Sequence, residues 1–154
     1  MASLVLSGDT SGSITVSAPA VAGSNTLTLP AVTGGVAITT ADKIGYYTGL
    51  GGAVTQATSK STGVTLDKLC GQITMSSASL SAAVEVTFTV TNSTIGSTDC
   101  VIVNHASAGT AGAYAVFANS IANGSFAITV SNLSAGSLSE AIVLNFAVIR
   151  GVSS

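Results

Sequence analysis

The stretch VEVTFTV, residues 84–90, decides the fold class of this 154-residue chain. Apolar and polar residues alternate strictly along it, so one side of the segment is apolar and the other is polar. A period of two is typical of a β-strand that is buried on one face and solvated on the other. The β-branched and aromatic residues of the stretch also favour strands. The stretch therefore indicates a β-sheet protein.

Further strand patterns follow toward the C-terminus. Cys100–Val103 is a short apolar run typical of a buried strand. Tyr114–Ile121 and Ser125–Val130 lie on either side of Asn123-Gly124, a pair that favours a tight hairpin turn. Ala141–Ile149 is apolar on both faces, which predicts a central strand or one covered by a neighbouring subunit. The spacing of strands and turns predicts an antiparallel, jelly-roll-like β-sandwich over residues 72–154, acting as an oligomerisation domain.

The first part of the chain has a different character. Ser13–Ala18 and Asn25–Pro30 alternate with period two and are separated by turn-type residues. A ribbon this small buries too little surface to be stable alone. We therefore expect an extended N-terminal β arm over residues 1–45 that lies on another surface. Residues 46–71, which begin with a Gly-rich stretch, are predicted to be a linker or loop.

Charge is unusually scarce in this chain. Only four basic and six acidic residues occur, 6% of the chain, and the formal net charge is −2. Average proteins have about 25% charged residues. A nucleic-acid-binding protein needs an excess of basic residues, which is absent here. The sequence also contains no apolar run of about 18 residues, the length that a membrane-spanning helix needs. Uncharged sheet faces can contact other protein copies without desolvating ions, so the composition indicates an assembly protein.

Candidate catalytic and metal-binding residues are few. His105 is the sole imidazole, and Asp99 is the nearest carboxylate for a hydrolytic arrangement, but no nucleophile motif accompanies them. Cys70, Cys100 and His105 lack the spacing of a metal site. Because no secretory signal precedes them, the two cysteines are expected to be free thiols. We expect no catalytic residue, no metal and no cofactor.

Apolar side chains on the predicted strands, together with a tyrosine pair, are the candidate interface residues. Aromatic residues are enriched in such contacts. The candidates are Ile14, Val16, Leu27, Leu29, Tyr46, Tyr47, Phe146 and Val148.

Three segments resemble structural proteins of tailed-bacteriophage particles. Residues 7–30, which contain Ser7-Gly8-Asp9 and Leu27-Thr28-Leu29-Pro30, look like a segment of phage fibre and other virion proteins. Residues 51–66 and 134–150 are similar to a second virion module. The resemblance implies an oligomer, most simply a homotrimer, with no catalysis.

The resemblance leaves the part of the particle open. An arm with one compact β domain suits a head decoration (cement) protein that clamps neighbouring major capsid subunits. Such a protein would be made in the bacterial cytoplasm and lie on the capsid exterior. One alternative is a short tail or head fibre that binds host surface glycans. Another is a carbohydrate-binding module or small depolymerase, for which paired acids and an aromatic platform are missing.

Overall fold

The computed structural model describes residues 3–7, 11–17, 39–40, 43–46 and 49–151. The chain divides into two compact units, Met1–Val36 and Ala37–Ser154. In the first unit, β1 (Ser3–Ser7) pairs antiparallel with β2 (Ser13–Ser17). The second unit contains the short pair β3 (Thr39–Thr40) and β4 (Lys43–Ile44) and eight further strands.

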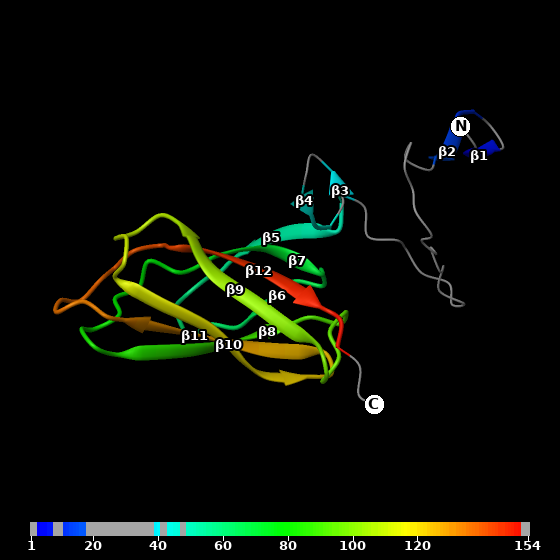
Figure 1. The fold of residues 1–154 in the computed structure, drawn as a ribbon. Coiled ribbons are helices and arrows are strands. Elements are labelled where there is room, and N and C mark those ends of the chain that lie inside the picture. The colour runs from blue at the N-terminus through cyan, green and yellow to red at the C-terminus, as the bar shows by residue number, and fades with distance from the viewer. Residues whose placement is uncertain (1–2, 8–10, 18–38, 41–42, 47–48, 152–154) are drawn as a thin grey trace. The chain divides into compact units, whose positions relative to one another are not determined.

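Those eight strands form two four-stranded sheets that face each other as a β-sandwich (Figure 1). The sequence prediction of an all-β sandwich is confirmed. The first sheet, called the β12 sheet, has the order β5 (Gly51–Thr55), β7 (Cys70–Thr74), β12 (Val143–Ile149), β9 (Cys100–Ser107). The second, called the β11 sheet, has the order β10 (Tyr114–Ala122), β11 (Ser125–Asn132), β8 (Glu85–Thr91), β6 (Val64–Thr65).

Two strands correct the prediction for residues 46–71. The segment expected to be a linker supplies β5 and β6, and both sheets are mixed rather than purely antiparallel. β5 pairs parallel with β7, and β6 pairs parallel with β8. After β5 the chain reverses direction and enters β6 of the opposite sheet, then reverses again and returns as β7. After these two reversals β7 runs in the same direction as β5. Parallel neighbours therefore arise here without a helical crossover.

The Asn-Gly signal correctly locates a hairpin. β10 and β11 pair antiparallel, and Ala122 lies opposite Ser125 across the two-residue turn. Gly124 has a φ of +83°, a conformation that glycine adopts without a steric penalty. The pairing shifts register between Asn119 and Ala122, where Ser120 has a φ of +50°. This irregularity is a bulge at the end of an edge strand.

The hydrophobic core lies between the two sheets. Phe126 of β11 and Phe146 of β12 meet there with ring centroids 5.4 Å apart and an interplanar angle of 54°. Phe146 and Val148, predicted as interface residues, are 4% and 1% exposed and belong to this core. Both apolar residues face the chain's own interior because β12 is a central strand. Their assignment to an intersubunit surface is therefore wrong.

The sandwich has two ends, which we name after their charged residues. The Arg150 end contains the start of β5, β7 and β9 and the end of β8 and β12. The Glu140 end contains the opposite termini of those strands. No helix that could cross a membrane occurs among the residues the structure describes.

Candidate functional site

The remaining predicted interface residues have different outcomes. Ile14 and Val16 lie on β2, opposite Leu6 and Leu4 of β1. Tyr46 is 39% exposed, and its hydroxyl donates a hydrogen bond to the backbone carbonyl of Val148. Desolvation raises the pKa of Tyr46. Tyr46 therefore links residues 43–46 to the end of β12. This hydrogen bond is a contact within the chain.

Three predicted interface residues, Leu27, Leu29 and Tyr47, lie outside the described residues.

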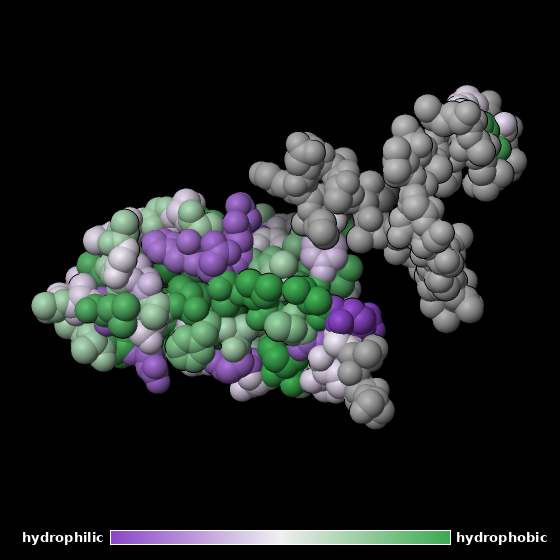
Figure 2. Space-filling model, viewed as in Figure 1, coloured by the Kyte–Doolittle hydropathy of each residue, from purple (hydrophilic) through white to green (hydrophobic). Residues whose placement is uncertain are grey.

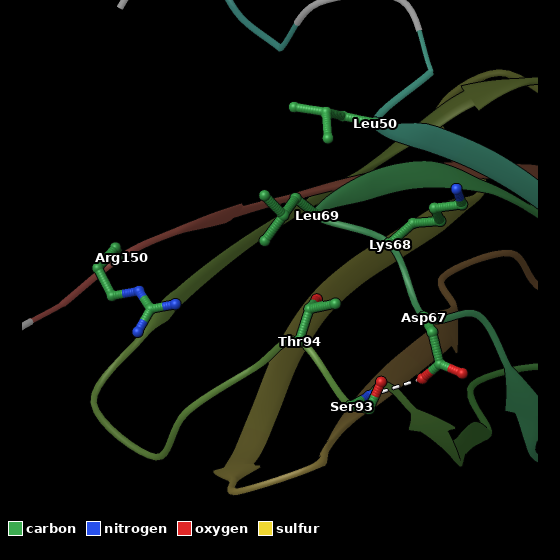
Figure 3. Close-up of a pocket in the computed structure, with 7 residues that line it drawn as sticks. All are labelled: Leu50, Asp67, Lys68, Leu69, Ser93, Thr94 and Arg150. Atoms are coloured by element: carbon green, nitrogen blue, oxygen red, sulfur yellow. Dashed lines mark hydrogen bonds between the residues drawn. The ribbon is translucent and has the colours of Figure 1, made fainter. Parts of the chain in front are cut away.

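A pocket with both polar and apolar lining opens at the Arg150 end (Figure 3). Its volume is about 510 Å³. Two leucines form its aliphatic wall, and the remaining lining side chains are hydroxyls and charged groups. The lining residues are Leu50, Asp67, Lys68, Leu69, Ser93, Thr94 and Arg150.

A hydrogen bond orients the Asp67 carboxylate of this pocket. The Ser93 backbone N–H donates to Asp67 Oδ1 at 2.7 Å, the bond drawn in Figure 3. This bond holds the pKa of Asp67 below its usual value. Lys68 points away from Arg150, and its Nζ lies 3.4 Å from the carbonyl oxygen of Gly49. The carboxylate is thus ionised and oriented at neutral pH.

Arg150 is the most available cation of the pocket. Its side chain is 73% exposed, and its Nε lies 3.8 Å from Asp99 Oδ1. Asp99 is buried and accepts hydrogen bonds from the backbone N–H groups of Gly96 and Gly151. The Gly96 bond is the largest cause that lowers the pKa of Asp99. Asp99 therefore anchors the chain around Arg150 and leaves the guanidinium free to hydrogen-bond a ligand.

The pocket offers hydrogen-bonding groups of several kinds. A guanidinium, a carboxylate and two hydroxyls beside aliphatic side chains are suited to bind a neutral polar ligand such as a sugar.

The structure separates the two residues considered for hydrolysis. His105 packs edge-to-face on Tyr114, with ring centroids 5.7 Å apart, and its Nε2 lies 2.7 Å from the carbonyl oxygen of Ala108. Asp99 lies directly before β9 and six residues before His105, a span of roughly 20 Å at 3.3 Å per residue. The two side chains therefore cannot act on one substrate atom.

Cys70 and Cys100 are both free and lie on strands that flank β12. Cys70 is opposite Ala147, and Cys100 is opposite Ile149. An intervening strand keeps their Cα atoms beyond the roughly 7 Å that a disulfide spans. Among the described residues, no three His, Cys, Asp or Glu side chains are grouped as metal ligands.

Charged side chains are confined to the two ends of the sandwich. The seven within residues 49–151 are Asp67, Lys68, Asp99 and Arg150 at one end and Lys60, Glu85 and Glu140 at the other.

The outward faces of both sheets are almost free of charge as a result. Because Leu144, Phe146 and Val148 are buried, the alternate residues of β12 point outward. By strand register, the outward residues of the β12 sheet include Ala53, Cys70, Gln72, Cys100, Ile102, Asn104, Asn145, Ala147 and Ile149. Those of the β11 sheet include Thr87, Thr89, Phe117, Asn119, Ala127, Thr129 and Ser131, with Glu85 at the border.

Sequence reasoning missed the pocket and the exposed apolar residues of the sheets. The pocket unites residues up to 100 positions apart, and no motif links them. Ile102 and Ile149 are each 53% exposed and Phe117 is 47% exposed. Alternation alone does not say which face of an apolar strand points outward.

Comparison with protein-family models, with curated proteins and with solved structures finds no match for this chain.

Proposed function

We propose that this chain is a structural protein of a bacteriophage particle that associates with copies of itself, as a homotrimer, and decorates the capsid exterior. One observation carries the proposal: charge is confined to the ends of the sandwich, and both sheet faces are free of it except at one border. Burying an unpaired ion in an interface costs several kcal/mol, and these surfaces avoid that cost.

The viral part of the proposal rests on the resemblance of residues 7–30, 51–66 and 134–150 to phage virion proteins. In this role the protein clamps neighbouring major capsid subunits after its synthesis in the bacterial cytoplasm. Interfaces of standard size bury about 800 Å² per partner, and apolar area contributes about 25 cal/mol per Å² before the costs of association. The role requires no catalysis, metal, cofactor, nucleic acid or membrane.

Cryo-electron microscopy of the phage particle tests this role. We expect density for the two-sheet domain at repeated positions over the capsid exterior, in contact with the major capsid protein. A particle whose capsid lacks the protein would overturn the decoration role.

The pocket of Figure 3 favours a second candidate, a short tail or head fibre that binds host surface glycans. Arg150 and Asp67 would then hydrogen-bond sugar hydroxyls, beside the aliphatic wall of Leu50 and Leu69. A glycan array probed with the full chain distinguishes the two roles. Binding that is lost in Arg150→Ala and Asp67→Asn but kept in Glu85→Gln supports the fibre role, and no binding argues against it.

A further inference from the structure

The strands β9 and β10 form one flank of the sandwich, which we call the β9–β10 flank. Each is an edge strand of its own sheet, and the two lie side by side without pairing. Figure 2 shows hydrophobic side chains gathered in a band across this side of the domain, with hydrophilic groups above and below it. Two edges and an apolar band therefore coincide on one surface.

The apolar character comes from exposed and half-buried side chains. Ile102 of β9 points outward from the β12 sheet and is 53% exposed, and Phe117 of β10 points outward from the β11 sheet and is 47% exposed. Each side chain thus borders the flank on its own sheet. Val101, Val103 and Val116 are partly buried and pack against the core. Monomeric proteins cover or charge such edges, because unpaired N–H and C=O groups beside apolar side chains promote pairing with another chain.

This flank carries no charged residue that would protect its edges. Residues 100–139, which include both strands and the loops that follow them, contain no Asp, Glu, Lys or Arg. Natural edge strands are commonly protected by lysine, proline or a covering element. The bulge near Ser120 interrupts only the last part of β10.

We propose that the β9–β10 flank is the contact through which one copy of this chain binds a second copy. The inference rests on the self-association in the proposed function and identifies its surface. The lack of charge on this flank favours a second copy as the binding partner. A partner with a charged surface would lose the hydration of its ions and find no counter-ion on this flank. A second copy presents an equally uncharged apolar band and an unpaired strand edge of its own.

The test uses lysine substitutions in the full chain and sedimentation velocity. Ile102→Lys and Phe117→Lys, made separately, place a charge in the contact and should reduce the oligomer to the 14.9 kDa monomer. Val84→Lys is the matched control, because Val84 is 45% exposed but precedes β8 at the Glu140 end. It should leave the oligomer intact. Thermal unfolding of each variant checks that the sandwich still folds.

The outcomes separate this inference from the broader proposal. If both flank variants sediment as the wild-type oligomer does, the flank is not the contact, while self-association stands. If Val84→Lys alone dissociates the oligomer, the contact lies at the Glu140 end and the flank is excluded. A wild-type chain that is monomeric at every concentration overturns both the flank contact and the proposed self-association. Cryo-electron microscopy decides separately where the protein lies in the particle.

Discussion

Gly71 sets how closely β5, β7 and the ring of Phe146 approach one another. A Cβ atom at this position would lie 2.6 Å from the carbonyl oxygen of Gly52 and 2.8 Å from Leu66 Cδ2. It would also lie 3.2 Å from Phe146 Cε1. The glycine therefore leaves the space that an aromatic side chain 75 positions later in the chain requires.

Gly71→Ala should destabilise the fold. The added methyl group meets backbone as well as side chain, so we expect a loss of about 1–3 kcal/mol in the free energy of unfolding. Urea denaturation measures this loss. Gly51→Ala is the control, because its Cβ would meet only Cys70, at 3.4 Å or more. Equal stability of the two variants would contradict the packing described for Gly71.

Glu140 makes stability depend on pH. Its carboxylate accepts hydrogen bonds from the backbone N–H and hydroxyl of Thr110 and from the Tyr114 hydroxyl, and these lower its pKa. Because the folded pKa lies below the unfolded one, the contribution is present above the unfolded value. It is lost as pH falls through the folded value.

We therefore expect Glu140→Gln to be less stable than wild type at neutral pH, with the difference shrinking below about pH 4. Urea midpoints measured between pH 7 and about pH 3 test this sign. Glu85→Gln is the control, since among the described residues the Glu85 carboxylate accepts one hydrogen bond, from Ser131 Oγ at 3.4 Å. A Glu140→Gln deficit that is constant across this range would refute the assignment.

At the scale of elements, a buried lysine holds the loop after β5 in place. Lys60 is 3% exposed, and its Nζ donates hydrogen bonds to the backbone carbonyls of Ser76 at 2.7 Å and Glu140 at 2.5 Å. Burial lowers its pKa. Gln56 adds bonds to the carbonyls of Lys60 and Thr62. The loop is thus joined to the end of β7 and the start of β12.

Lys60→Met should leave two backbone carbonyls without their donor. We expect a loss of about 1–3 kcal/mol in the free energy of unfolding, the usual cost of unsatisfied buried groups. Lys68→Met is the control, because Lys68 is only half-buried and its Nζ makes one long contact, 3.4 Å from the carbonyl oxygen of Gly49. It should change stability by no more than about 0.5 kcal/mol. Chemical denaturation of the pair decides whether Lys60 is structural.

The elements also show where sequence patterns suffice. The alternation at residues 84–90 predicted β8, where Phe88 and Val90 are buried while Thr87 and Thr89 are exposed. The Asn-Gly turn predicted the β10–β11 hairpin. β5 and β6 were missed because one begins with two glycines and the other has two residues, too short for any period. Their pairing depends on partners distant in sequence.

The functional surfaces were less predictable than the strands. Phe146 and Val148 were expected at an interface, but a strand that is apolar on both sides does not reveal which side its own core covers. The pocket depends on Asp67, Ser93 and Arg150, which meet only after the sheets have formed. The composition shows that charged residues are few. Their confinement to the two ends of the sandwich could be recognised only from the strand topology.

At the scale of the whole molecule, the central claim is that this uncharged exterior is an assembly surface. Neighbouring copies, rather than water alone, are expected to cover the apolar residues of the sheet faces and the β9–β10 flank. The stability of such an assembly increases with protein concentration by mass action.

Sedimentation equilibrium of the wild-type chain over a range of concentrations tests this claim most directly. We expect a species with three times the mass of the 14.9 kDa chain, which dissociates only on dilution. A single species with the mass of one chain at every concentration, folded and soluble, would contradict it.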